Sequence, residues 1–388
     1  MSREWCSRCA GSEIFHLLLR HSSVRRTSTL LLAACLLASA CQEALPAPPP
    51  TPSPSALILP APTFLEGQIP AVSDLRVDLP PNTSHLDVSG GTLFGLQYVV
   101  DLPRGFHLVA AVPPTHDWRV VYTSAADGNM TSGTIGNDAR RTFVELTFQL
   151  GIAAFEIVTV DVATGTARRL DRSTIPSPLL ALLSQRARPT VVGSGDLVAW
   201  TRVLREGDGF VWELYETAQD PGAPPRLVRR SDQPLVPLAF DGRLAFVVVG
   251  PERDQLWTYD RTNGVQAAWP TTAAGVTAAA WSEAGLVVAT IDVRAVGATN
   301  AISIVDERGG ARPIVNATLC AQLAVSGRYL TWTCSRATDL RAFDLRTGTF
   351  PLVARSIGAF DFRVAGNSFV WTEGIAGKNT ARLLVLPP

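Results

Sequence analysis

The sequence predicts an all-β fold built from repeated four-stranded units, and three observations support this prediction. Short runs of Val, Ile, Leu, Thr and aromatic residues are separated by Gly and Asp along most of the 388-residue chain, as expected of strands and turns rather than helices. A turn followed by a strand recurs about every forty residues. A second pattern, a strand that ends in Asp with Gly four residues later, occurs between these copies.

The first 41 residues predict an export signal. Arg25 and Arg26 precede an apolar run at 30–38, which ends in small residues before Cys41. A positive segment, a short apolar core and small residues before the cleavage point make up a secretory signal peptide. The run is shorter than the roughly 20 residues of a membrane-spanning helix. We interpret Val24 as the start of translation, which would leave residues 1–23 untranslated.

Small residues directly before a cysteine resemble the lipobox of bacterial lipoproteins, in which the thiol is acylated. Cys41 follows the complete apolar run and leads into a proline-rich stretch, whereas Cys35 has the better Leu-Ala-Ala approach. We predict acylation at Cys41, with Cys35 as the alternative and ordinary cleavage near Ala40 as a third possibility. The resemblance implies an exported, extracytoplasmic protein of the cell envelope that touches the membrane through its lipid anchor only.

A tether separates this signal from the β-rich region. Residues 42–63 are rich in Pro, Ala, Ser and Thr and carry almost no charge, a composition that favours extended chain over a packed core. We therefore divide the chain into a signal peptide and lipobox (1–41), a Pro-rich linker (42–63) and a β domain (64–388).

The turn-and-strand repeat gives the size of the unit. Clear copies begin at Ser194, Asp241, Ser326 and Ala365, and weaker ones at Asp117 and Gly285. Four strands in about 40–45 residues is the dimension of a β-propeller blade. We predict seven blades, or six if the segment at 89–94 does not belong to a full blade. The last copy, around Trp371, lacks an outermost strand, which residues 74–78 would supply to close the ring.

The Asp-to-Gly pattern predicts hairpins. It occurs at Asp101–Gly105, Asp161–Gly165, Asp260–Gly264, Asp306–Gly310 and Asp344–Gly348. Asp accepts hydrogen bonds from backbone amides two residues ahead, and Gly tolerates the positive φ that closes the turn. We interpret these aspartates as turn formers.

The strands at 256–260 and 340–348 resemble the repeats of TolB-like, WD-repeat-like β-propellers, and the resemblance covers about residues 85–388. It implies the propeller architecture. The chain departs from the usual Pro-Asp-Gly inner turn of that family and keeps Asp-Gly in one blade, at Asp241-Gly242.

The amino-acid composition excludes some classes of function. The chain has 34 Lys+Arg and 34 Asp+Glu, so it offers no basic field for nucleic acid. Lys378 is the only lysine, and no histidine follows His116. Most of the chain therefore has no His to serve as a base or metal ligand, and we predict no catalytic residue, cofactor or metal site.

Cys320 and Cys334 are placed symmetrically about the turn at 326–328. Opposite positions on paired strands, in an exported protein, predict a disulfide. The alternative is two buried thiols that pack as small hydrophobes.

Insertions predict a binding face. The longest are 124–154 and 175–189, and residues 178–183 suit a short helix with Pro at its start. Loops at 124–154, 202–209 and 252–254 should follow second strands and gather at one end of the channel. The candidate binding residues on them are Asp127, Arg140, Arg141, Arg205, Glu206, Asp208, Arg253 and Asp254. This mixed charge suits a protein or a polar ligand.

We therefore predict a lipid-anchored envelope propeller that serves as a binding or scaffolding module rather than an enzyme. One alternative is a propeller enzyme that uses carboxylates of the channel on saccharides or other polar substrates. The other is a purely structural envelope protein.

Overall fold

The computed structural model describes residues 63–68, 71–99, 105–124, 135–149, 151–181, 183–220, 222–269, 275–292, 299–306, 310–318, 320–326, 328–334, 340–354, 360–375 and 378–387. All of these residues belong to the second of the two units into which the chain divides, Leu59–Pro388, and the fold below is that of this unit. The predicted signal peptide, Cys35, Cys41, most of the linker and Asp127 lie outside the described residues.

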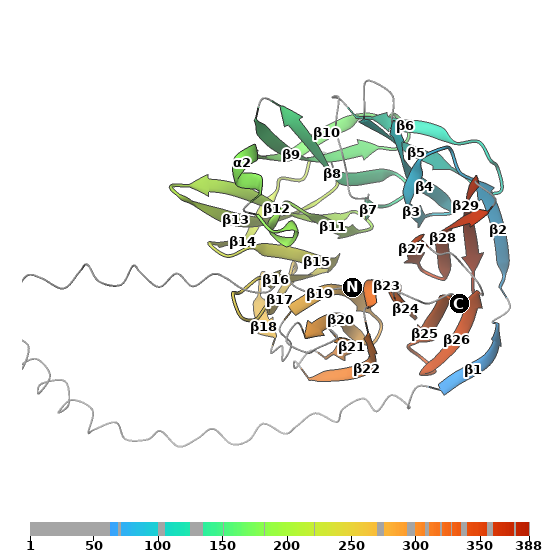
Figure 1. Cartoon of the computed structure of the whole chain (residues 1–388). Coiled ribbons are helices and arrows are strands. Elements are labelled where there is room, and N and C mark those ends of the chain that lie inside the picture. Colours follow the sequence, from blue (N-terminus) through green and yellow to red (C-terminus); the bar gives the residue numbers. More distant parts are fainter. Residues whose placement is uncertain are drawn as a thin grey trace, which may run out of the picture. The chain divides into compact units, whose positions relative to one another are not determined.

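The described strands form seven sheets, and each has the four-stranded antiparallel meander of a propeller blade. The prediction of an all-β, seven-bladed propeller is therefore confirmed (Figure 1).

Blade I contains β3 (Thr83–Ser89), β4 (Thr92–Val99), β5 (Gly105–Ala111) and β6 (Arg119–Thr123). Blade II contains β7 (Ile135–Gly136), β8 (Arg140–Gln149), β9 (Ile152–Asp161) and β10 (Ala167–Pro176). Blade III contains β11 (Val191–Ser194), β12 (Leu197–Glu206), β13 (Gly209–Ala218) and β14 (Arg226–Ser231).

The second half of the chain repeats this arrangement. Blade IV contains β15 (Leu235–Asp241), β16 (Arg243–Val248), β17 (Gln255–Asp260) and β18 (Gln266–Trp269). Blade V contains β19 (Gly275–Ser282), β20 (Gly285–Asp292), β21 (Thr299–Val305) and β22 (Ala311–Thr318). Blade VI contains β23 (Cys320–Ser326), β24 (Tyr329–Cys334), β25 (Leu340–Asp344) and β26 (Thr349–Ala354). Blade VII contains β27 (Phe360–Ala365), β28 (Ser368–Ile375) and β29 (Lys378–Val385).

An N-terminal strand completes blade VII. Strand β2 (Ser73–Asp78) pairs antiparallel with β29, from Ser73 opposite Val385 to Asp78 opposite Thr380. Arg382 donates two hydrogen bonds to Asp74 across this pair, at 2.8 and 2.7 Å. The predicted closing strand is thus confirmed. Strand β1 (Thr63–Gln68), which the sequence did not predict, lies parallel to β26 as a fifth strand of blade VI.

Apolar side chains fill the spaces between neighbouring blades. Phe94 and Phe106 of blade I pack with Phe143 of blade II, and the rings of Phe106 and Phe143 meet edge to face with centroids 5.5 Å apart. Leu93 of blade I packs with Val370 of blade VII, which closes the core around the ring. Each blade thus buries both faces against its neighbours, as single sheets cannot do alone.

Three of the five predicted Asp-to-Gly hairpins, at Asp161, Asp260 and Asp344, form with a positive φ at Gly; at Asp306 the Gly310 φ is not positive, and Asp101 lies outside the described residues. Asp161 accepts hydrogen bonds from the backbone N–H groups of Ala163 and Thr164, at 3.1 and 2.9 Å. Gly165 then takes a φ of +72°, in the left-handed region that Gly adopts without steric cost. Asp260 and Asp344 accept backbone hydrogen bonds in the same way.

The meander gives the ring two distinct faces. The turns between first and second strands and between third and fourth strands lie on one face, which we call the hairpin face. The turns between second and third strands and the connections between blades lie on the opposite face, the loop face. Helix α2 (Ser177–Leu180) and the 3-10 helix η1 (Gln185–Ala187) belong to one such connection, between blades II and III. Among the described residues, no helix is long and apolar enough to cross a membrane.

Candidate functional site

The structure corrects the predicted loop at 124–154. Residues Arg140–Gln149 form β8, and β9 begins at Ile152. The sequence there alternates apolar and polar residues, as a half-buried strand does, and we misinterpreted it as an insertion. Because Arg140 and Arg141 follow the turn between β7 and β8, they lie on the hairpin face and not with the other candidate residues.

Arg141 has a structural role. Its side chain is fully buried, pairs with Asp87 of blade I and donates to the carbonyl oxygen of Gly136 at 3.1 Å. The guanidinium also lies 4.5 Å from the ring centroid of Phe94, a cation–π distance. Arg141 therefore joins blade II to blade I and is not available to a partner.

The second predicted insertion, residues 175–189, contributes to the loop face. Pro178 lies in the first turn of α2, as predicted. Beyond it, Arg186 donates to a carboxylate oxygen of Asp254 and to the carbonyl oxygen of Val276, at 2.7 Å each. Asp254, a predicted binding residue, is only 3 % exposed. It therefore fixes the connection between blades II and III to blades IV and V, while its neighbour Arg253 stays exposed.

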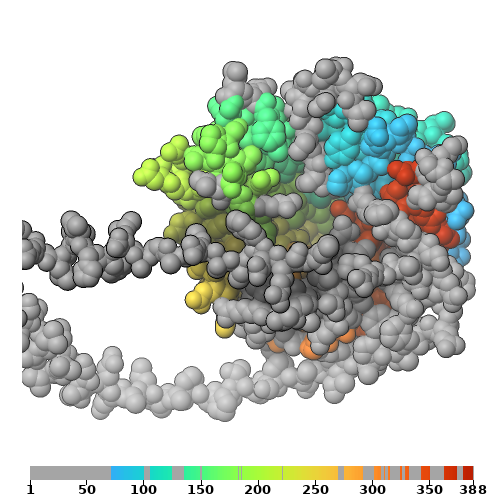
Figure 2. All heavy atoms as spheres, in the orientation of Figure 1, coloured from blue at the N-terminus to red at the C-terminus, as the bar shows by residue number. Residues whose placement is uncertain are grey.

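The hairpin between β12 and β13 carries Arg205, Glu206 and Asp208. It projects from the left of the ring in Figure 1 and forms the yellow-green protrusion in Figure 2. Arg205 donates from Nε to the carbonyl oxygen of Gly207 at 3.3 Å. Glu206 forms an ion pair with Arg230 of β14, and both side chains are 49 % exposed. These predicted residues are thus exposed on the loop face and held by local contacts.

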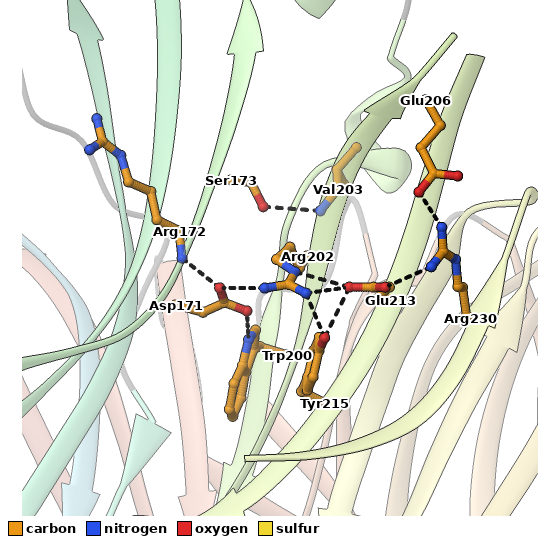
Figure 3. Close-up of polar contacts among 10 residues, drawn as sticks. All are labelled: Asp171, Arg172, Ser173, Trp200, Arg202, Val203, Glu206, Glu213, Tyr215 and Arg230. Carbon is orange, nitrogen blue, oxygen red and sulfur yellow. Dashed lines mark hydrogen bonds and ion pairs between the residues drawn. The ribbon is translucent and has the colours of Figure 1, made fainter. Parts of the chain in front are cut away.

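Behind this hairpin lies a chain of alternating charges, which we call the charged ridge: Asp171, Arg202, Glu213, Arg230 and Glu206 (Figure 3). Arg202 is central, since its Nη2 lies 2.6 Å from Glu213 Oε2 and 2.6 Å from the Tyr215 hydroxyl oxygen. On one side, Arg202 reaches Asp171 of blade II at 3.5 Å. On the other, Glu213 lies 3.5 Å from Arg230.

Aromatic rings pack against the charged ridge and hydrogen-bond to it. Trp200, fully buried, donates its indole N–H to Asp171 at 2.8 Å. The Trp200 and Tyr215 rings are stacked with centroids 5.7 Å apart, and the Arg202 guanidinium lies 4.9 Å from the Tyr215 centroid. The inner end of the ridge is therefore fixed by packing and hydrogen bonds, whereas its outer end at Glu206 and Arg230 is exposed.

The pKa values agree with this arrangement. Burial opposes ionisation of Glu213, but hydrogen bonds from Arg202 and Tyr215 outweigh it, so the pKa of Glu213 lies below its ordinary value. Burial and the same carboxylate raise the pKa of Tyr215. Glu213 thus stays ionised and Tyr215 stays protonated near neutral pH. The ion pair between Arg202 and Glu213 therefore persists at that pH.

Apolar groups lie on the same face. Phe148 and Ile152, at the tip of the β8–β9 hairpin, are 48 % and 44 % exposed. Helix α2 packs beside this hairpin, where the Ser177 N–H donates to the Gly151 carbonyl oxygen at 2.7 Å. The loop face of blades II to IV therefore combines exposed charges with exposed apolar side chains.

Sequence reasoning missed Arg202, Glu213 and Arg230. Arg202 and Glu213 are register partners across the β12–β13 hairpin, and both lie equally far from its turn at Gly207 and Asp208. The same symmetry argument that we applied to the cysteines could have paired them. Arg230 and Asp171 come from other strands, and no local pattern points to them.

For the predicted disulfide, the structure describes only the backbone positions of the two cysteines. Cys320 and Cys334 are register partners on β23 and β24, so the predicted cross-strand position is correct. Their side chains lie outside the described residues, and the disulfide stays a prediction.

Comparisons with known proteins identify the fold. No protein-family model matches the chain, and no curated protein matches it. An oligogalacturonate lyase from Vibrio parahaemolyticus is 11 % identical, with a TM-score of 0.56 over 83 % of this chain and 99 % of that chain. The β-propeller domain of the trilobed protease from Pyrococcus furiosus is 10 % identical, with a TM-score of 0.55 over 78 % of this chain and 94 % of that one.

A TolB is also among the solved structures that the chain matches. The TolB of Acinetobacter baumannii is 10 % identical over 76 % of this chain and 80 % of that chain, with a TM-score of 0.38. At these identities the comparisons establish the β-propeller architecture alone.

Proposed function

We propose that this protein is a lipid-anchored binding module of the cell envelope, and that the loop face of blades II to IV captures a protein or a polar ligand. The observation that carries the proposal is the charged ridge. Its inner residues are fixed by the Arg202–Glu213 and Trp200–Asp171 contacts, and its outer end exposes Glu206 and Arg230.

A rigid charged surface favours specific binding. Ordering a free side chain at an interface costs about 0.5–1.5 kcal/mol, and the ion pairs of the ridge remove much of that cost before a partner arrives. Arg and aromatic residues also contribute disproportionately to protein interfaces. Phe148 and Ile152 add apolar area beside the charges, a combination that suits a protein partner.

The carboxyl groups with displaced pKa values do not have the property that a general acid needs. A general acid needs a raised pKa. The carboxyl groups with displaced pKa values among the described residues all lie below their ordinary values: Asp74, Asp161, Glu213, Glu283 and Asp344. Each accepts hydrogen bonds from Arg or from backbone N–H groups, and none lies on the innermost strand of its blade.

The anchor is a separate part of the proposal, supported by the lipobox-like approach to Cys41 and the proline-rich tether after it. Cys41→Ser should release the protein from the detergent phase in Triton X-114 partition, whereas Cys35→Ser should leave it there. Release by Cys35→Ser alone would move the acylated residue to Cys35. No effect of either substitution would contradict lipid anchoring.

Charge reversal tests the binding face without a change in net charge. The variant Arg205→Glu/Asp208→Arg alters the exposed hairpin of the loop face. The matched control, Arg140→Glu/Asp241→Arg, alters the hairpin face. We expect the full-length wild type and the control to retain the same partner from solubilised envelopes, and the first variant to retain at least about tenfold less. Equal capture by all three would contradict the proposed face.

A further inference from the structure

A cavity lies on the hairpin face between blades III and IV, opposite the loop face. Its volume is about 610 Å³, and it is lined by Glu216, Thr217, Ala223, Pro224, Pro225, Arg226 and Arg261. The volume falls within the range of small-molecule sites, about 300–1,000 Å³. No residue of the charged ridge lines it, so this cavity is independent of the proposed binding face.

The walls of the cavity are fixed. The Thr217 hydroxyl donates to the carbonyl oxygens of Ala223 and Pro224, at 3.2 and 3.4 Å, and two consecutive prolines restrict the chain beyond. On the other side, Arg261 of the β17–β18 turn donates from Nε to Glu216 Oε2 at 2.8 Å. Glu216 is only 2 % exposed, so this ion pair holds the two blades together at the cavity floor.

The cavity has more positive charge than its own residues neutralise. Arg261 uses Nε on Glu216, and its two terminal nitrogens have no hydrogen-bond partner among the described residues. Arg226 forms no ion pair within that part of the chain, and its guanidinium lies 5.6 Å from the ring centroid of Tyr259. Two guanidinium groups therefore face one carboxylate.

A buried hydroxyl gives a second, independent indication. The Tyr259 side chain is 2 % exposed, and its hydroxyl has no hydrogen-bond partner among the described residues. Tyr259 lies next to the cavity lining, since its ring centroid is 5.6 Å from the Arg226 guanidinium, and Glu216, Arg226, Arg261 and Asp260 all act electrostatically on its hydroxyl. A buried donor without a partner costs free energy unless a ligand or water satisfies it.

We propose that this cavity binds a small anion through its carboxylate or phosphate groups. The terminal nitrogens of Arg226 and Arg261 form charge-assisted hydrogen bonds with the anion, for which guanidinium groups are well suited. Glu216 orients Arg261 and offsets one of the two positive charges of the lining. The proline wall closes the cavity on the blade III side.

Calorimetric titration of the full-length protein in detergent, at constant ionic strength, tests this site. The probes are inorganic phosphate and citrate, which separate phosphate from carboxylate recognition. We expect saturable binding of at least one probe at a single site. Arg226→Gln should raise its Kd about tenfold or more, because a charge-assisted hydrogen bond is lost. Glu216→Gln should lower Kd, because it removes the opposing charge while the Gln oxygen can still accept from Arg261.

The matched control is Arg253→Gln, which removes an exposed arginine of the loop face and should leave Kd unchanged. Arg226→Lys keeps the charge but loses the planar fork, and its Kd should fall between those of wild type and Arg226→Gln. The thermal midpoint of each variant verifies folding. Absence of saturable binding to the wild type, or equal Kd values for Arg226→Gln and Arg253→Gln, would overturn the proposal. Neither result bears on capture by the loop face.

Discussion

At the scale of single residues, one sequence pattern produces two different structural roles. Asp161 is partly exposed, and in its hairpin it accepts from the backbone of Ala163 and Thr164 and from the Thr164 hydroxyl. Asp344 is 3 % exposed and accepts two further hydrogen bonds from Arg328, at 3.0 and 2.7 Å. The pattern predicted both turns. It could not predict the Arg328 pair, because that contact depends on the register of β24 and β25.

We therefore expect Asp344→Ala to lower the free energy of unfolding by about 2–3 kcal/mol, because it removes both the turn acceptor and the carboxylate that Arg328 binds. Asp161→Ala, the matched substitution in a turn whose Asp has no Arg hydrogen bond, should cost less. Urea denaturation at pH 7 measures both. Equal losses would show that Arg328 adds nothing to the turn.

The ion pair between Asp344 and Arg328 makes the free energy of unfolding depend on pH. Burial raises the pKa of Asp344, but hydrogen bonds from Arg328 and from the Arg346 N–H outweigh it, so the folded pKa lies below the ordinary value. A depressed pKa contributes stability above the unfolded value, near 4, that is lost as the pH falls through the folded value. The difference between wild type and Asp344→Ala should therefore shrink below about pH 4. A constant difference down to pH 3 would contradict this account.

At the scale of elements, strands and turns could be predicted where the signal is local. The hairpins at Gly165, Gly264 and Gly348 follow from Asp and Gly spacing, and the short helix α2 follows from Pro178. Strand β8 was missed because β7, the strand before it in the blade, has only two residues, so the turn-and-strand signal that precedes β8 is weak. Strand β1 was missed because it pairs with β26 across almost 290 positions of sequence, and no local pattern encodes such a contact.

The closing strand gives a prediction at this scale. Removal of residues 1–78 deletes β2, leaves the edge of β29 unpaired and removes Asp74, one of the two carboxylates that Arg382 binds. We expect the thermal midpoint to fall by about 10 °C or more and the protein to self-associate through the free edge. Removal of residues 1–68 deletes β1 only and should have a smaller effect. Circular dichroism and size-exclusion chromatography measure both, and equal midpoints would contradict closure by β2.

At the scale of the whole molecule, the ring separates two kinds of surface. The hairpin face is formed by turns whose Asp residues bond their own backbone, with one cavity lined by Arg226 and Arg261. The loop face carries the exposed outer end of the charged ridge at Glu206 and Arg230, Arg205 and Asp208, together with the apolar tip at Phe148 and Ile152. Blade count and ring closure could be predicted from the sequence. The ridge could not, because its members come from four strands of two blades.

Photo-crosslinking in intact cells tests the central claim, that the loop face binds a partner, most directly. A benzoylphenylalanine placed at position 208 lies on the exposed hairpin of the loop face, and one placed at position 241 lies on an exposed turn of the hairpin face. We predict a discrete crosslinked adduct of higher mass from position 208 and none from position 241. An adduct from position 241 alone, or none from position 208 in a folded protein, would contradict the claim.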